Sequence, residues 1–296
     1  MPYYERRGIP TSQPEKLNID EAYKRAQKTF DAEAVDLNNF GSLYDARTIR
    51  EDREYVRARM AKFEIDPAKK LATIFEAIIH EQAELNEWLG PDITTIKSSE
   101  FDDIAHGVDT IVHFDQEEGG DADIGLAIDV TFGTHIREKL NAIMEEIERG
   151  ELTEVKYLSY PDPDDPDAYI FTHSKMPRVI IGAEEQTVKD VGGLWFAKKR
   201  KELAEHPIKH LIAKEIMDQL ALFEQHARLH NRSDIASSYR RMLGIMERRF
   251  KEKEKSMTVK QGYASDEALG PLKNDRILHS INDYLFDIIM SSDGKK

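Results

Sequence analysis

Two aspartates in the middle of the chain have the surroundings expected of metal ligands. Asp109 stands at the start of one alternating apolar run, and Asp129 stands near the end of the next. Each alternates with the large apolar residues of its run, so each faces away from the main apolar face of a predicted strand. If the strands pair, the two carboxylates converge where they could bind a hard cation such as Mg²⁺ or Mn²⁺. Such a metal can activate water and stabilise a phosphodiester transition state.

Residues of two predicted helices could complete this site. Lys139 borders the apolar stripe of the helix after Asp129, where its ammonium could steady an attacking hydroxide or a phosphate oxygen. Glu81 sits on the apolar stripe of an earlier helix, a costly place for a carboxylate unless it is paired or bound to a metal. Lys156, on a later predicted strand, competes with Lys139 for the lysine role. The choice between Glu81 and its sequence neighbours stays open: Glu76, Glu84 and Glu87.

Each of these residues also has an ordinary structural explanation. Asp109 and Asp129 could be strand-edge or turn aspartates. Lys139 could be a surface lysine whose stem lies along the apolar stripe. The sequence leaves both interpretations open.

Hydrophobic patterning predicts the elements that hold these residues. Alternation predicts strands over residues 108–114 and 124–132. The acidic segment between them, 115–123, contains a glycine pair and predicts an antiparallel hairpin. Helical periodicity predicts helices over residues 66–89 and 134–149 that pack on the sheet through their apolar stripes.

The remaining pattern places helices on both sides of this segment. Further strands are predicted over 93–97, 154–160 and 178–182, whereas most of the proline-rich segment 160–176 is predicted to be loop. We therefore expect an α/β fold with a central mixed β-sheet and flanking helices over residues 66–182, between an N-terminal helical extension (1–65) and a C-terminal helical region (183–296). The predicted terminal helices cover 18–34, 44–63, 184–204, 207–230, 233–255 and 266–290.

The order of these elements and the placement of their acids resemble the PD-(D/E)XK nuclease superfamily. In that family, a helix with a glutamate precedes a β-meander in which one strand carries an aspartate. The next strand carries an acidic residue, a spacer and a lysine, and a helix and another strand follow. Glu81, Asp109 and Asp129 match the acidic positions. The resemblance implies a restriction-endonuclease-like core, Mg²⁺ or Mn²⁺ at these three residues, and action on DNA or RNA.

The chain departs from the family at the lysine position, which holds Thr131. Some members of the superfamily supply the lysine from the following helix, and Lys139 fits that variation. Other members have lost residues and activity. The alternative to a nuclease is therefore a catalytically inactive structural or protein-interaction module on the same fold.

Charge and composition limit the partners. The net charge of −14 disfavours nonspecific coating of nucleic acid. A local basic run between residues 240 and 260 is a possible phosphate-binding path, with a solvated helix face as the alternative. The candidate nucleic-acid-binding residues are Arg240, Arg241, Arg248, Arg249 and Lys251.

The sequence also excludes several kinds of site. It contains no cysteine, which rules out disulfides and thiolate chemistry. It shows neither a signal-peptide pattern nor an apolar run of about 20 residues, so we expect a cytoplasmic protein outside the membrane.

Four weaker groups are given ordinary interpretations. Two acidic groups are predicted to lie in solvated loops. The first is Glu100, Asp102 and Asp103, which could instead be outer metal ligands near Asp109, and the second is Asp162, Asp164, Asp165 and Asp167. Two helical histidine pairs have a spacing that can bind zinc, but neither has the glutamate of a His-Glu-x-x-His motif: His206 with His210, and His226 with His230.

Overall fold

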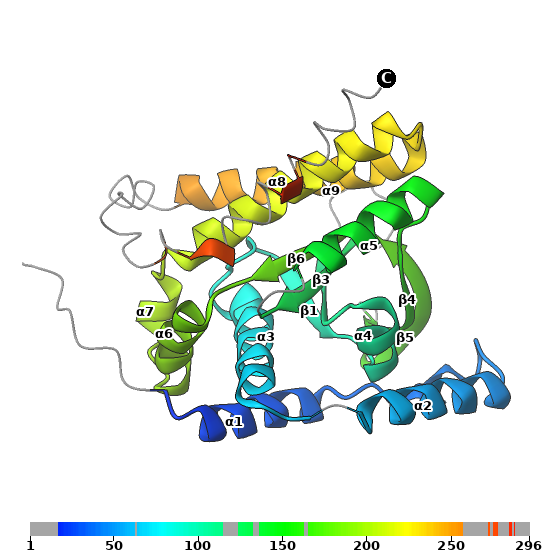
Figure 1. Cartoon of the computed structure of the whole chain (residues 1–296), viewed down its shortest axis with the longest axis horizontal. Coiled ribbons are helices and arrows are strands. Elements are labelled where there is room, and N and C mark those ends of the chain that lie inside the picture. Colours follow the sequence, from blue (N-terminus) through cyan, green and yellow to red (C-terminus); the bar gives the residue numbers. More distant parts are fainter. Residues whose placement is uncertain are drawn as a thin grey trace, which may run out of the picture.

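The computed structural model describes residues 17–62, 64–114, 124–132, 136–162 and 165–256, together with residues 272, 275–277, 284–285 and 287. A four-stranded mixed sheet lies at the centre of this part of the chain (Figure 1). Its strands, in spatial order, are β1 (Ile93–Lys97), β2 (Thr110–Phe114), β3 (Ile124–Thr131) and β6 (Arg178–Gly182).

The first three strands form an antiparallel meander, and β6 runs parallel to β3. Thr110 of β2 lies opposite Ile128 of β3. This register confirms the predicted antiparallel pairing of the runs 108–114 and 124–132. The predicted turn between them, 115–123, lies outside the described residues.

Helices precede, interrupt and follow this sheet. Before it come α1 (Ile19–Ala32), the short 3₁₀ helix η1 (Leu37–Phe40), α2 (Ala46–Met60) and α3 (Pro67–Leu85). Between its strands come α4 (Glu100–His106) and α5 (Ile136–Arg149). After it come α6 (Glu185–Phe196), α7 (Arg200–Ala204), α8 (Ile208–Leu229) and α9 (Ser233–Ser256). The predicted helix 266–290 lies mostly outside the described residues, and none of the described helices is long and apolar enough to span a bilayer.

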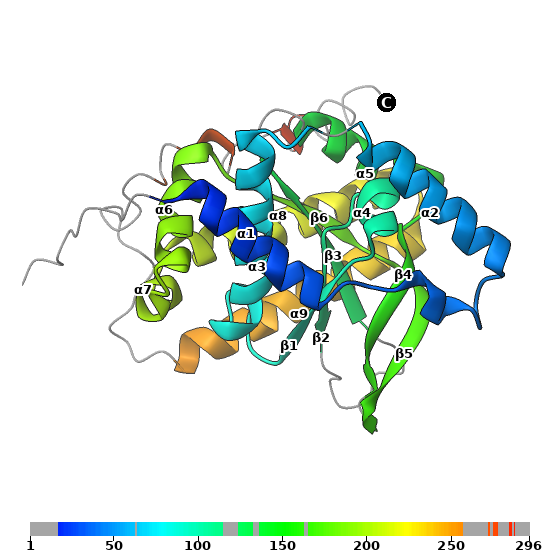
Figure 2. The same ribbon diagram turned by 90° about the horizontal axis from the view of Figure 1, so that it is seen from below.

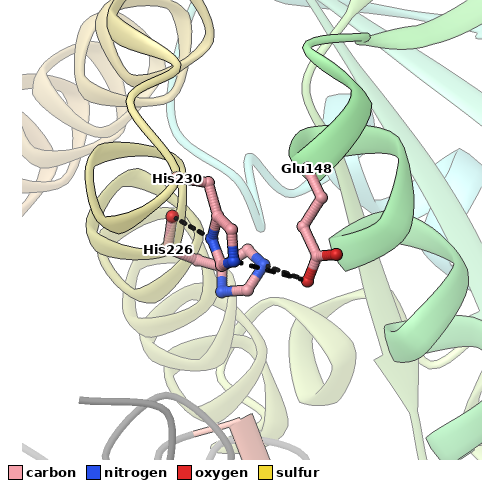
Figure 3. Close-up of side chains that lie close together, drawn as sticks. All are labelled: Glu148, His226 and His230. Carbon is pink, nitrogen blue, oxygen red and sulfur yellow. Dashed lines mark hydrogen bonds and ion pairs between the residues drawn. The ribbon is translucent and has the colours of Figure 1, made fainter. Parts of the chain in front are cut away.

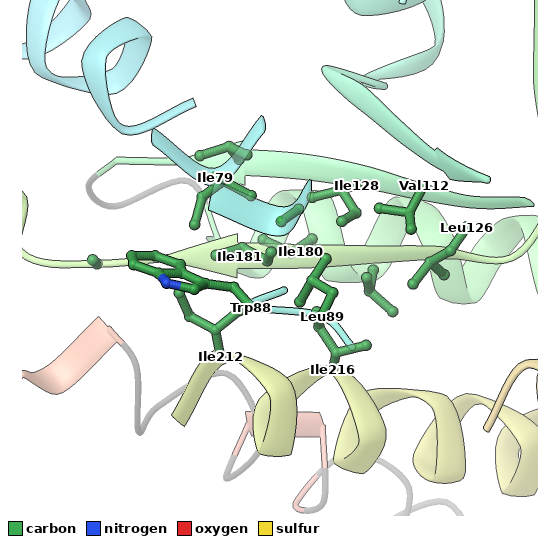
Figure 4. Close-up of a cluster of buried hydrophobic side chains, with 14 of the residues drawn as sticks. Ile79, Trp88, Leu89, Val112, Leu126, Ile128, Ile180, Ile181, Ile212 and Ile216 are labelled. Atoms are coloured by element: carbon green, nitrogen blue, oxygen red, sulfur yellow. The ribbon is translucent and has the colours of Figure 1, made fainter. Parts of the chain in front are cut away.

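The two faces of the sheet have different coverings. The face with Val112, Leu126 and Ile128 belongs to the main core, which also contains the buried stripes of α3, α5 and α8 (Figure 4). The predicted packing of the helices over 66–89 and 134–149 on the sheet is therefore confirmed. The opposite face, with Ile111 and Ala127, packs against a separate two-stranded ribbon. Because side chains alternate along a strand, Asp109 and Asp129 lie on this second face.

That ribbon corrects the predicted loop over 160–176. β4 (Thr153–Asp162) and β5 (Asp165–Met176) form an antiparallel hairpin beside the sheet (Figure 2). The prolines misled the prediction, although Pro161 lies near the end of β4 and Pro166 near the start of β5. A two-stranded ribbon has two edge strands, and edge strands tolerate proline.

A second correction concerns the acidic segment before Asp109. Residues 100–106 form helix α4, capped by Ser99, whose Oγ accepts from the Asp102 backbone N–H at 3.0 Å. The solvated-loop prediction is wrong for Asp102, which is fully buried. Its carboxylate accepts from the backbone N–H groups of Lys156 at 2.7 Å and Tyr157 at 3.0 Å. Asp102 therefore attaches α4 to β4.

We predict that Asp102→Asn lowers the free energy of unfolding by about 2–3 kcal/mol, because an amide cannot accept from both backbone donors without bringing its own N–H against one of them. Denaturant unfolding measures this change. Asp31→Asn, at an exposed position of α1, is the control and should change the value by less than about 0.5 kcal/mol. Equal stability of the two variants would contradict the attachment role.

Candidate functional site

Backbone hydrogen bonds hold Asp109 against β3. Its N–H donates to the Ile128 carbonyl at 2.9 Å, and its Oδ2 accepts from the Val130 N–H at 2.6 Å. These bonds fix the Asp109 carboxylate beside the strand that carries Asp129. Both aspartates are buried and line one cavity of about 730 Å³.

Lys139 reaches the same cavity from α5. Its Nζ forms an ion pair with Oδ1 of Asp129, and about a third of its side chain is exposed. The other lysine candidate, Lys156, lies elsewhere, because its Nζ pairs with Oδ2 of Asp52 at 2.5 Å. The geometry therefore brings Lys139 rather than Lys156 to the aspartates.

The glutamate of α3 that lines the cavity is Glu76, and the predicted ligand Glu81 lies elsewhere. Glu81 accepts from Thr29 Oγ1 at 3.0 Å and Trp195 Nε1 at 2.7 Å, and it lies 3.6 Å from the Arg25 guanidinium. These partners offset the cost of a carboxylate on the apolar stripe. Five residues are about 1.4 helical turns, which turns Glu81 well away from the direction of Glu76.

Glu76, which lines the cavity, also belongs to a second lysine–carboxylate pair. Lys97 Nζ of β1 lies 2.9 Å from Glu76 Oε1 and donates to the Asp109 carbonyl at 2.9 Å. Asp103 of α4 also lines the cavity, so the solvated-loop prediction is wrong for this residue as well, whereas Glu100 is exposed.

Arg178 is a cavity residue that the sequence did not single out. Its guanidinium, at the start of β6, donates to Glu146 Oε1 at 3.1 Å and to the His106 carbonyl. It lies against Gly107, whose φ of 66° is left-handed and where a Cβ would come within 2.7 Å of Arg178 Nη1. The only signal in the sequence was a single basic residue at the start of an apolar strand.

Burial and mutual repulsion perturb the acids of this cavity. Burial, reinforced by Asp109, raises the pKa of Asp129 to about 6 even though Lys139 opposes the shift. The same two causes raise the pKa of Asp103 well above its usual range. Burial also raises the pKa of Glu76 despite the opposing charge of Lys97. A group of acids that resist ionisation is an environment that favours an added cation.

The pKa of Lys139 is raised as well, but by the neighbouring charges and not by burial. Burial would lower the pKa of Lys139, but Asp129 and Asp109 outweigh this effect and raise it. Lys139 is therefore a fixed positive charge at neutral pH. An ammonium in this position can stabilise negative charge on a bound phosphate or an attacking oxygen.

The five predicted nucleic-acid-binding residues of α9 do not share one surface. Arg249 is buried, and its guanidinium donates to the carbonyls of Pro91 and Asp92, the latter at 2.9 Å. Arg240 is exposed and pairs with Glu224 at 2.6 Å. The other three side chains are exposed: Arg241, Arg248 and Lys251. Arg249 is thus unavailable to a phosphate backbone.

A second cluster of possible ligands lies at the end of α5. Glu148, His226 and His230 are the described residues in which three metal-ligating atoms all lie within 4.8 Å of one another (Figure 3). The carboxylates of Asp109, Asp129 and Glu76 do not form such a group. The sequence suggested the His226–His230 pair, but Glu148 comes from a distant helix, so no local motif could have indicated it.

Comparison of the chain with protein-family models, with curated proteins and with solved structures found no match. A function for this chain must therefore be inferred from the geometry of the two clusters.

We predict that Lys139→Met raises the pKa of Asp129 above its value of about 6, because the substitution removes the cation that favours the ionised carboxylate. The pH dependence of the ¹³C chemical shift of the Asp129 carboxyl group, recorded in the presence of EDTA, measures this pKa. Lys156→Met should leave it unchanged. An unaltered pKa in the Lys139 variant would show that the ion pair does not form in solution.

Proposed function

We propose that this chain is a nuclease-like protein that acts on DNA or RNA with Mg²⁺ or Mn²⁺ at the cavity of Asp109, Asp129, Glu76 and Lys139. The observation that carries the proposal is the contact of the Lys139 ammonium with Asp129, in the cavity that also holds Asp109. Metal-assisted phosphodiester hydrolysis can use carboxylates that bind the ion and a lysine that stabilises developing negative charge.

The donor set fits a hard divalent cation. Asp109 and Asp129 offer carboxylate oxygens from a β-meander, and Glu76 adds one from α3. Mg²⁺ usually takes only one or two carboxylates and completes its shell with waters and substrate phosphate oxygens. Because the three carboxylates do not form a close three-ligand group, one or two of them would bind the ion directly. A bound Mg²⁺ would supply Lewis-acid polarisation of the phosphate and a water of lowered pKa.

The side chains of the cavity have separable tasks in this proposal. Lys139 stabilises the negative charge that develops on the phosphorane-like transition state. Asp109 is held rigidly by the Val130 N–H, so its carboxylate is oriented before substrate binds. Exposed Lys69 and Lys175 line the same cavity and can attract the phosphate backbone.

The element order also supports a restriction-endonuclease-like core. Helix α3, which carries Glu76, precedes the meander β1–β2–β3. Helix α5 follows, the β4–β5 ribbon intervenes, and β6 then pairs parallel to β3. The strand expected over 154–160 belongs to that ribbon and not to the central sheet, so β6 takes its place in the comparison. This order agrees with the resemblance to PD-(D/E)XK nucleases, with Glu76 in place of Glu81 as the helical glutamate. Lys139 supplies the charge that Thr131 cannot.

The ion pairs of the cavity carboxylates also fit one alternative, a catalytically inactive module. Lys139 and Lys97 already compensate Asp129 and Glu76 without any metal. A chain that has become a structural or protein-interaction module could keep such pairs for stability alone. Activity, rather than fold, separates this alternative from the nuclease.

We predict metal-dependent cleavage of a nucleic acid by the purified chain, tested on single- and double-stranded DNA and RNA with Mg²⁺ or Mn²⁺. Asp109→Asn and Asp129→Asn should abolish cleavage. Lys139→Ala should lower the rate on the order of 10²-fold or more, the usual cost of removing a positioned electrostatic group. Circular dichroism would confirm that each variant is folded.

Two matched pairs of variants test whether the cavity residues in particular are needed for cleavage. Glu76→Gln should impair cleavage more than Glu81→Gln, because only Glu76 lines the cavity. Lys139→Ala should impair it more than Lys156→Ala. No cleavage of any substrate by the wild-type chain would point to the interaction module, and full activity of the Lys139 variant would remove that lysine from the mechanism.

A further inference from the structure

The cluster of Glu148, His226 and His230 joins two helices that are far apart in the sequence. Glu148 lies in the last turn of α5, His226 in the last turn of α8, and His230 directly after α8. A spacing of four residues places both histidines on one side of the helix. Their ring centroids are 4.4 Å apart, and both rings face the Glu148 carboxylate (Figure 3).

The distances within the cluster suit a tetrahedral metal. Glu148 Oε1 lies 3.3 Å from His226 Nε2 and 3.8 Å from His230 Nε2. Ligand atoms bound to one tetrahedral Zn²⁺ at about 2.0–2.1 Å lie roughly 3.3 Å from each other. The three atoms therefore need only small shifts to share one ion.

His226 is the observation that points to a ligand rather than to a chance contact. Its side chain is 1% exposed, and its nearest polar partners, the Glu148 carboxylate and the Met144 backbone, do not form hydrogen bonds of good geometry with the ring. A buried imidazole without good partners is costly, because the polar atoms have lost water without a replacement. A bound metal would satisfy the ring nitrogen that faces Glu148.

Hydrogen bonds to backbone carbonyls help to hold His230 and the end of α5 in place. His230 Nδ1 lies 3.0 Å from the His226 carbonyl, an arrangement in which Nδ1 donates and the Nε2 lone pair is directed at Glu148. Metal-binding histidines usually donate their second nitrogen in this way. Arg232 Nε donates to the Glu148 carbonyl at 2.7 Å, which holds the end of α5 against the segment after α8.

We propose that Glu148, His226 and His230 form a binding site for Zn²⁺, with a fourth position open to water. Two imidazoles and one carboxylate are donors that suit zinc better than Mg²⁺. This site is separate from the Mg²⁺ or Mn²⁺ cavity and does not depend on the chain being a nuclease. It links α5, the helix that carries Lys139, to α8.

The test is titration of Zn²⁺ into the EDTA-treated full chain by calorimetry. We expect one Zn²⁺ per chain and a loss of affinity on the order of 10²-fold or more in Glu148→Gln and in His230→Gln, since even residues behind metal ligands change affinity 10- to 100-fold. Glu148 and His230 are partly exposed, so both variants should fold. His173→Gln, at an exposed histidine paired with Glu154, is the control and should bind as the wild type does.

A second measurement reports the link between the helices. Zn²⁺ should raise the thermal midpoint of the wild-type chain by a few degrees and leave that of His230→Gln unchanged, because only a ligand of the folded state stabilises it. Asp109→Asn should keep this zinc response, which separates the two sites. Absence of zinc binding by the wild type, or equal binding by wild type, Glu148→Gln and His230→Gln, would overturn the proposal.

Discussion

Two hydrogen bonds between Asp109, directly before β2, and the last half of β3 determine the geometry of the whole cavity. Asp109 N–H donates to the Ile128 carbonyl, and the Val130 N–H donates to the Asp109 carboxylate. They lock the register in which Asp109 and Asp129 lie on one face. A slip of one residue would turn Asp129 into the apolar main core, away from Lys139. The buried residues Leu126 and Ile128 oppose that slip, because it would take them out of the main core.

Burying several carboxylates in this cavity costs free energy, and cations from the surrounding elements offset that cost. Lys139 from α5 and Arg178 from β6 line the cavity, and Lys97 from β1 pairs with Glu76 of its lining, so three elements each bring one cation to these acids. Removing one partner of such a pair leaves an uncompensated buried charge. The arrangement therefore makes the cavity sensitive to the position of α5. The proposed zinc site at the far end of α5 would act on the same helix.

Features that depend on the local pattern of apolar and polar residues could be predicted from the sequence. Alternation gave the two strands, their antiparallel pairing and the shared side of Asp109 and Asp129, and helical periodicity placed Lys139 at the border of its stripe. The choice of Glu81 over Glu76 could not be made locally. Both lie on α3, and only the tertiary partners of Glu81 show which way it points.

Features set by long-range contact were missed for the same reason. Asp102 looked like a loop residue because its partners, the N–H groups of Lys156 and Tyr157, lie more than fifty residues away. Arg249 looked like a phosphate ligand in a basic run, although the carbonyls of Pro91 and Asp92 hold it in the interior. The β4–β5 ribbon was obscured by its prolines.

Crystals of the chain soaked in Mn²⁺ and measured at the manganese absorption edge would test the central claim most directly. The account predicts an anomalous peak in contact with the carboxylates of Asp109 and Asp129, lost in crystals of the Asp129→Asn variant. Two results would contradict this account. One is manganese bound only at Glu148, His226 and His230, and the other is the absence of a peak in the cavity while Lys139 still contacts Asp129.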